Sequence, residues 1–373
     1  MTNQPNEADR YEGKIPAEKE KKKHRFPLGV RILFTVLIVL LCLLIALAVT
    51  VLILYESGHR RMELNPDTVI SFPSESGTDK AVIVQKDDQG KLIEYNGHTY
   101  ELNENLTTVL FMGIDKAITD ETTSYGSAGQ ADVILLIALD TQTGQSKIIC
   151  FPRDAYAEVD KYSINGRYLG TDNTQLCLAF AYGDQHELSC ENMITSVERF
   201  LYGLPISGYV ALDLRGILLA NDSIGGVTLN SLTDFRFYDG ATVKAGEQTT
   251  LLGKHAEAYI RSRSHETKDA NVARMARQKQ YVQSFASTVI HRAKGDPTSL
   301  IDLYKLLDPY MVTNIGLDGA TYLAPIVLKG GMSFGEVHVI ESTIEMVDGY
   351  PMYYLDENDL KDAVVSAFYK QID

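Results

Sequence analysis

Apolar and polar residues follow different periods along the chain, and these periods predict where helices and strands lie. From Ile32 to Tyr55 nearly every residue is apolar and none is charged. About 20 such residues cross a hydrocarbon core roughly 30 Å thick, which predicts a transmembrane helix, with a buried core helix as the alternative. The segment is too long for the apolar part of a signal peptide, which spans about 7–15 residues.

Beyond this span, short apolar runs predict strands. Continuous apolar runs are typical of strands that are buried on both faces of a sheet. Asn96-Gly97 lies between two alternating stretches of Lys80–Leu102 and predicts a β-hairpin there. The strands predicted in this way are Thr108–Ile114, Asp132–Leu139, Ser146–Phe151, Tyr209–Leu214 and one that starts at Gly225-Gly226-Val227.

Apolar residues at helical spacing predict helices between these strands. Glu257–Arg263 fits either a short strand or a helix end. From Val337 onward the sequence predicts a strand followed by a tyrosine-rich turn. The predicted helices are Leu176–Tyr182, Glu191–Leu201, Ala270–Ala293 and a closing helix from Glu357. Because strands and helices interleave, we expect an α/β fold (an α+β sandwich) with a central mixed β-sheet flanked by helices.

Composition divides the chain into four parts. They are a polar tail (1–31), the transmembrane helix (32–55), a stalk with a small β-hairpin (56–105) and a large folded domain (106–373). Lysines and arginines are more frequent just before the span than just after it. The positive-inside rule therefore predicts a single-pass protein of the cell membrane, with its N-terminus in the cytoplasm and its large domain outside.

Charge and cysteine usage narrow the function classes. The net charge of −14 argues against nucleic acid as a partner, because a duplex repels an acidic surface. An anionic ligand would therefore need a local basic pocket. Cys177 and Cys190 flank a polar loop of the external domain, where oxidation is permitted. The spacing leaves open whether they form a disulfide.

Charged residues at the ends of the predicted strands are the first candidate site. Asp115 ends one buried strand and Asp132 opens the next. Two carboxylates at adjacent strand ends suit a hard cation with oxygen ligands, although each is also compatible with a turn or cap. Arg153 follows a third strand, where its guanidinium is either an ordinary surface group or a grip for phosphate.

Further basic residues lie in two clusters. Arg261 and Arg263 are two apart, so in an extended segment their side chains point the same way. Arg274, Arg277 and Gln278 share one face of the predicted long helix, as they would on an ordinary solvated helix. Together with the two aspartates, these residues suit a diphosphate and a bridging divalent ion, provided that they converge in space.

Residues 107–285 resemble the LytR-CpsA-Psr family of bacterial envelope proteins. The likeness is carried by seven motifs in order behind a single membrane span. They are Thr108-Val-Leu-Phe-Met-Gly-Ile-Asp115, Ala131-Asp-Val-Ile-Leu-Leu136, Phe151-Pro-Arg-Asp154, Ala179-Phe-Ala-Tyr-Gly183, Ile224-Gly-Gly-Val227, Glu257-Ala-Tyr-Ile-Arg-Ser-Arg263 and Arg274-Met-Ala-Arg-Gln278.

The resemblance implies a function. Family members transfer phosphate-linked glycopolymers, such as teichoic acid or capsule, from a polyprenyl-diphosphate carrier to peptidoglycan. It implies Mg²⁺ (or Mn²⁺) on Asp115 and Asp132, membrane lipid as a partner, and an apolar cavity for the lipid tail. Asp269 or Asp154 is a candidate general base. The residues expected on the diphosphate are Arg153, Arg261, Arg263, Arg274 and Gln278, with Arg277 from the same helix face.

The chain departs from the family pattern at three positions. Gln130 stands where an arginine is usual, Gln175 where a lysine is frequent, and Asn271 where an acid is usual. Lys116, Lys161 and Arg167 are candidates to supply the missing charge. Two other functions stay open: a non-catalytic regulator or attenuator that binds polyprenyl phosphate, and a polyprenyl-diphosphate hydrolase with water as the acceptor.

Overall fold

The computed structural model describes residues 28–64, 69–70, 72, 83–118, 125–262, 270–330 and 334–373. The chain divides into two compact units, residues 1–51 and 52–373. The helix predicted at 32–55 is present but longer: α1 spans Leu28–Met62, so the first residues of the predicted stalk are helical. Its segment Cys42–Met62 is long and apolar enough to cross a membrane. Most of the predicted cytoplasmic tail lies outside the described residues.

A six-stranded mixed sheet forms the centre of the second unit, in the order β14-β9-β4-β5-β6-β15 among the described residues. The strands predicted from continuous apolar runs are its middle strands, which confirms the expected fold class. Their bounds are β4 Leu106–Ile114, β5 Ala131–Asp140, β6 Ser146–Phe151, β9 Gly208–Asp213, β14 Met311–Thr313 and β15 Phe334–Val339.

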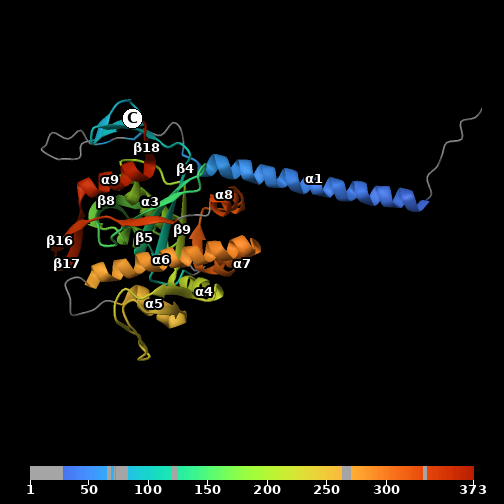
Figure 1. The fold of residues 1–373 in the computed structure, drawn as a ribbon. Coiled ribbons are helices and arrows are strands. Elements are labelled where there is room, and N and C mark those ends of the chain that lie inside the picture. Colours follow the sequence, from blue (N-terminus) through green and yellow to red (C-terminus); the bar gives the residue numbers. More distant parts are fainter. Residues whose placement is uncertain are drawn as a thin grey trace, which may run out of the picture. The chain divides into compact units, whose positions relative to one another are not determined.

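Helices cover both faces of this sheet (Figure 1). Alternate residues of β4 and β5 face opposite layers: Leu110 and Leu136 join the larger core with α3 and α9, whereas Leu135 faces Val282 of α6. The helices are α2 Leu178–Ala181, α3 Glu187–Phe200, α4 Leu214–Ser223, α5 Gly253–Arg261, α6 Ala270–Gly295, α7 Thr298–Leu307, α8 Leu317–Gly330 and α9 Glu357–Phe368, with the 3-10 helix η1 Asp308–Tyr310.

Strand direction brings several chain segments to one edge of the sheet. β4 runs parallel to β9 and antiparallel to β5, and β5 is antiparallel to β6. The carboxyl ends of β4, β9 and β6 and the start of β5 therefore meet at the same edge. Asp115, Asp132 and Arg153 all follow or open these strands. The topology alone thus gathers three of the predicted site residues.

The predicted hairpin is present and joins the end of the chain. Asn96 and Gly97, with φ of 51° and 81°, form the turn between β2 and β3 that needs positive φ at both positions. β3 also pairs with β18, so the hairpin belongs to a four-stranded sheet. The strands of this sheet are β1 Ile83–Gln85, β2 Leu92–Tyr95, β3 His98–Leu102 and β18 Tyr369–Gln371.

Four smaller pairings complete the fold, and one of them borders the functional edge. β7 pairs with β8, β10 with β13, β11 with β12, and β16 with β17. Ala155, just before β7, bridges to Tyr353 of β17. The bounds are β7 Tyr156–Tyr162, β8 Tyr168–Gln175, β10 Val227–Asn230, β11 Phe235–Arg236, β12 Thr242–Val243, β13 Gln248–Leu251, β16 Ser342–Val347 and β17 Tyr350–Leu355.

The turn after β5 is held by a buried carboxylate. Asp140 accepts hydrogen bonds from the backbone N–H of Thr143 at 2.8 Å and from Asn103 Nδ2 at 2.7 Å, and it pairs with Lys370 at 3.1 Å. Burial works to raise the pKa of Asp140, but these donors outweigh it and hold the pKa at about 2. The turn is therefore stabilised by the ionised form of this residue.

The structure answers two questions that the sequence left open. Cys177 and Cys190 are both buried free thiols, so the disulfide that the spacing left open is not formed. Cys177 faces the guanidinium of Arg153, whereas Cys190, a residue of α3, packs in the larger core. The segment around Arg261 is not extended, because Arg261 is the last residue of helix α5. Alternation of side chains therefore does not govern its direction.

Candidate active site

The two predicted metal-binding aspartates lie beside each other at the edge of the sheet. The β4–β5 register shifts between Gly113 and Ile114, so that Asp132 lies at an irregularity of the ladder. Asp115 exchanges two hydrogen bonds with Gln130: its N–H donates to the Gln130 carbonyl at 3.1 Å, and its Oδ1 accepts from the Gln130 N–H at 2.7 Å. These two hydrogen bonds fix the position of the Asp115 carboxylate.

Gly129 is the residue that allows this close approach. A Cβ at this position would lie 2.6 Å from Cγ2 of Ile114 and 2.9 Å from Oδ1 of Asp115. A larger side chain would therefore push the Asp115 carboxylate away from its position. The glycine belongs to the site even though it carries no chemistry.

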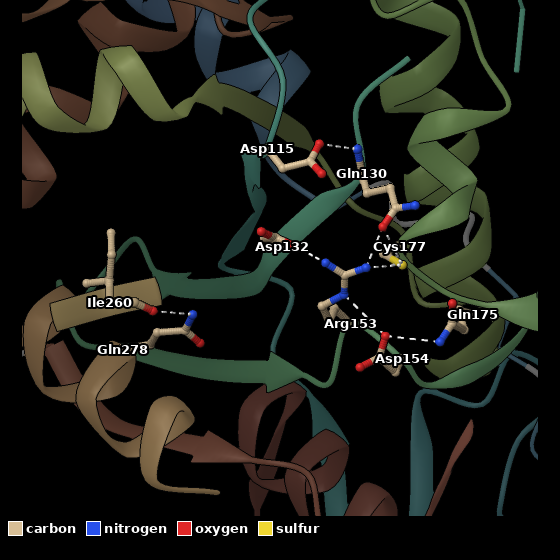
Figure 2. A network of polar contacts seen from close by, with 9 residues as sticks. All are labelled: Asp115, Gln130, Asp132, Arg153, Asp154, Gln175, Cys177, Ile260 and Gln278. Carbon is tan, nitrogen blue, oxygen red and sulfur yellow. Dashed lines mark hydrogen bonds and ion pairs between the residues drawn. The ribbon is translucent and has the colours of Figure 1, made fainter. Parts of the chain in front are cut away.

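Arg153 is the centre of a polar network (Figure 2). Its Nη1 pairs with Asp132, its Nη2 donates to Gln130 Oε1, and its Nε donates to Asp154 Oδ1 at 3.2 Å. Its Nη2 also lies 3.4 Å from Sγ of Cys177. With all three nitrogens engaged and only 17% of the side chain exposed, the guanidinium is held in a fixed orientation rather than on a solvated surface.

Three more of the predicted residues lie across a cavity from the two aspartates. Arg261 at the end of α5, and Arg274 and Gln278 on α6, border a cavity of about 210 Å³ whose other wall includes Asp115 and Asp132. A small adjoining hollow is lined by Arg153, Asp154, Arg274 and Gln278. The cationic and acidic residues that the sequence marked out separately therefore converge at one place.

Arg261 and Arg274 differ in how freely they reach the cavity. Arg261 is half-exposed and forms an ion pair with Glu257 one helical turn earlier, at 3.0 Å. Arg274 is buried. A buried guanidinium interacts more strongly with an anion than an exposed one, because little water screens it. We therefore expect Arg274 to attract a bound anion more strongly than Arg261 does.

Arg277 was expected on the diphosphate, but its guanidinium points into the protein interior. Its Nε donates to the carbonyl of Tyr259 at 2.8 Å, its Nη2 donates to the carbonyl of Ser262, and it lies over the ring of Phe235. Arg277 lies only about 60° around α6 from Arg274, but its side chain bends toward the carbonyl groups at the end of α5, because α6 packs against α5 there. Burial lowers its pKa. Arg277 therefore holds the end of α5 rather than the ligand.

Gln278 supports the same helix end from the cavity side. Its Nε2 donates to the carbonyl of Ile260 at 3.1 Å. The last carbonyls of a helix lack intrahelical partners, and α6 supplies them here. Arg263 and Asp269, the two remaining predicted residues, lie outside the described residues.

An apolar cavity adjoins the charged one. It has a volume of about 320 Å³ and an almost entirely apolar lining from β4, β5, β9, α6 and α7. Val133, Ile217, Ile260 and Gln278 line both cavities. A molecule with an anionic head and an apolar tail fits this arrangement, because the head meets arginines while the tail is shielded from water.

The two aspartates suit one particular kind of metal site. Among the described residues no cluster of three or more His, Cys, Asp or Glu side chains could hold an ion. These residues alone therefore do not supply a complete set of metal ligands. Mg²⁺ is commonly bound by one or two carboxylates and completed by substrate phosphates and water. Asp115 and Asp132 fit such a shared site.

Several contacts of the site had no signal in the sequence. Tyr353 of β17 borders the hollow at Arg153, and Gln175 donates to both Asp154 and the carbonyl of Pro351, each at 3.1 Å. The positions Gln130 and Gln175 were marked only as departures from a pattern, and both prove to contact the Arg153 network. Of the candidate replacements, Lys161 pairs with Asp172 and Lys116 donates to the carbonyl of Ser127. Neither lines the cavity.

Comparisons with known proteins agree with this picture. The LytR_cpsA_psr family model matches residues 70–367. The chain is 26% identical over 265 residues to the polyisoprenyl-teichoic acid–peptidoglycan teichoic acid transferase TagU of Bacillus subtilis (strain 168), covering 68% of this chain and 74% of that relative.

Solved structures share the fold. A Streptococcus agalactiae protein superposes with a TM-score of 0.59 at 18% identity, covering 72% of this chain and 91% of the other. Bacillus subtilis TagV superposes with a TM-score of 0.53 at 21% identity, covering 70% and 96%. At these identities the likeness concerns the fold alone.

Proposed function

The chain belongs to the LytR_cpsA_psr family, and from this premise we propose that it transfers a phosphate-linked glycopolymer, of teichoic acid or capsule type, from a polyprenyl-diphosphate carrier to peptidoglycan. One observation carries the proposal: Arg261, Arg274, Asp115 and Asp132 surround a single cavity that adjoins an apolar one. A polyprenyl diphosphate has the matching division into a doubly anionic head and a hydrocarbon tail.

The proposed reaction breaks the phosphoanhydride bond of the diphosphate and forms one new phosphoester bond. A sugar hydroxyl of peptidoglycan attacks the phosphorus nearer the glycan and forms a new P–O bond. The bond from that phosphorus to the bridging oxygen breaks, and polyprenyl phosphate leaves with the bonding electrons. The hydroxyl proton passes to a carboxylate or to water. Asp154 is held by Arg153 and Gln175, which suits a positioning role better than proton transfer.

The arginines supply most of the expected rate. Donors that are fixed before the reaction stabilise charge that develops in the transition state without paying for reorganisation. Arg274 is buried and Arg153 is held by three partners, so both are fixed in this sense. Mg²⁺ or Mn²⁺ on Asp115 and Asp132 would neutralise negative charge on the diphosphate when bound.

A position at the membrane suits the proposed lipid-linked glycopolymer donor. The family's substrate is anchored in lipid, and a protein tethered by α1 meets it at a high effective concentration. We place the N-terminus in the cytoplasm and residues after α1 outside, because basic residues gather before the span. Peptidoglycan, the acceptor, lies on that side.

The experiment uses the full chain in lipid nanodiscs, a polyprenyl-diphosphate-linked oligosaccharide and peptidoglycan fragments. Arg261→Ala and Arg274→Gln are compared with Arg236→Ala, an exposed arginine of β11 outside the cavity. Loss of one preorganised donor costs about 10²–10³ in rate, so we expect this loss for the two cavity variants and none for the control. Arg261→Ala removes only a half-exposed ion pair, which leaves the fold intact.

Two product measurements separate transfer from the other functions. Transfer gives equal amounts of polyprenyl phosphate and of glycan joined to peptidoglycan. Release of polyprenyl phosphate without attached glycan would identify a hydrolase, and tight binding without release would identify a regulator. Either result, or full turnover by folded Arg261→Ala and Arg274→Gln proteins, would overturn the proposal.

A further inference from the structure

Helix α7 has a composition that its position in the fold does not explain. Six of its ten residues are Leu, Ile or Tyr, yet none of them is buried. Leu300, Leu303 and Leu307 line the apolar cavity. Ile301 and Tyr304, each one position further along the helix, are 57% and 43% exposed. A helix that is apolar on more than one face normally has a partner on each.

The second observation concerns the end of α1, which packs tightly against α8. Gly58 lies so close that a Cβ there would be 2.2 Å from the carbonyl oxygen of Asp318. Arg61 pairs with Asp318 at 2.5 Å, and the ring of Tyr322 lies 5.3 Å from that of Tyr55. The last two turns of α1 are therefore part of the folded unit rather than a loose tether.

α8 connects this contact to the apolar cavity. Its first turns hold the end of α1 through Asp318 and Tyr322, and its last turn contributes Val327 to the cavity wall that α7 completes. Both α7 and α8 pack against α6. The uncharged stretch of α1 ends at Tyr55, which contacts Tyr322 of α8, so the surface of a bilayer crossed by α1 lies close to α8. Tyr55 and Tyr322 are the residue type that is enriched at that depth.

We propose that the outer face of α7, defined by Ile301 and Tyr304, inserts into the outer surface of the lipid bilayer. This placement gives the exposed apolar side chains of α7 the hydrocarbon partner that the fold lacks. It also puts the apolar cavity directly behind the inserted helix, so a lipid tail passes from the bilayer into the protein without crossing water. The occupant of this face is lipid, not another protein.

The charges on and beside α7 are compatible with this depth. Asp302 and Lys305 are the only charged residues of the helix, and both are exposed. Lys294 and Arg292 in the last turn of α6 add positive charge nearby, which favours an anionic lipid surface. The insertion is therefore shallow, at the level of the headgroups and the first methylenes.

The absence of tryptophan in the sequence allows a direct test with the full chain in nanodiscs. Ile301→Trp and Tyr304→Trp each introduce a single indole on α7. Tyr350→Trp on β17, at a position that is 64% exposed and outside the apolar cavity, is the matched control. Each protein is reconstituted in ordinary lipid and in brominated lipid, and aqueous iodide is then added.

We expect the emission of I301W and Y304W to be blue-shifted, to lose most of its intensity in brominated lipid and to resist iodide. The control should show the opposite response to both quenchers. Quenching of the α7 variants by iodide alone would overturn the proposal. Protection from both quenchers would also overturn it, because a second protein copy would then cover the face. Unchanged thermal melting checks that each variant is folded.

This inference does not depend on catalysis. The quenching measurement needs no donor, no acceptor and no metal. A protein that inserts α7 but transfers nothing would refute the proposed function alone, and a protein that transfers with α7 in water would refute this inference alone.

Discussion

Filling the apolar cavity should separate the recognition of lipid from the recognition of diphosphate. Ala286 of α6 is buried and lines the cavity of about 320 Å³ beside Tyr281 and Val282. Ala286→Phe places a ring in this space without touching the arginines of the neighbouring cavity. The perturbation therefore removes room for the tail while the head site stays unchanged.

The size of the effect follows from the lost apolar contact. Burying one methylene contributes about 0.8 kcal/mol, so excluding one five-carbon isoprene unit costs up to about 4 kcal/mol. Ordering a flexible chain offsets much of that gain in the native protein. We therefore expect a net penalty of about 1.4–2.8 kcal/mol, or a tenfold to hundredfold rise in KM for a long-chain donor.

The assay compares two donors that share one head group. Transfer from a long polyprenyl diphosphate and from a short, water-soluble prenyl diphosphate is measured for wild type and for Ala286→Val, Ala286→Leu and Ala286→Phe. KM for the long donor should rise along the series, and KM for the short donor should stay constant. An equal loss with both donors would indicate general damage, and no loss with either would show that the tail binds elsewhere. Thermal melting of Ala286→Phe should match or exceed wild type, because the ring fills an existing void.

Three further predictions concern other parts of the molecule. Gln130→Arg should tighten pyrophosphate binding by about tenfold in calorimetry, since a hydrogen bond to a charged group contributes about 1.5 kcal/mol; unchanged affinity would place residue 130 beyond reach of the ligand. Asp140→Asn should lower the free energy of unfolding by roughly 2 kcal/mol at neutral pH, because the pKa of Asp140 is depressed to about 2, and the deficit should shrink as pH falls from about 4 to 2; a constant deficit would contradict this. Cys177 and Cys190 should stay unmodified by maleimide in the native protein, since burial raises the pKa of both thiols, and both should react after denaturation without reductant; a missing pair would reveal a disulfide.

The sequence predicted the centre of the fold well because its strands are apolar on both faces. β4, β5 and β6 read as continuous apolar runs, and the structure places them with bounds that differ by at most two residues. The ends of these strands were therefore located correctly. Once strand directions are known, Asp115, Asp132 and Arg153 have to lie at one edge.

The site predictions that were wrong, undecided or missing depend on how side chains turn and on contacts between distant residues, which the local sequence pattern does not report. Arg277 shares a helix face with Arg274 in a coarse sense, but the packing of α5 against α6 turns its side chain inward. Whether Arg261 lay on a strand or at a helix end was left open, because the short segment Glu257–Arg263, of mixed polarity, fits both periods. Tyr353 borders the Arg153 hollow from roughly 200 residues further along the chain, and no local signal reports such a contact.

The pairing of β3 with β18 has a consequence for how the protein matures. The N–H of Thr99 is bonded to Asp373 and the hydroxyl of Tyr369 to the carbonyl of Gly90, across 274 and 279 residues. A chain that crosses a membrane from its N-terminus delivers the hairpin first and its partner strand last. The edge of β3 is then open throughout export, when it could pair with a neighbouring chain. In the topology proposed above, export of the domain after α1 should therefore depend on whatever shields that edge until residue 371 has emerged.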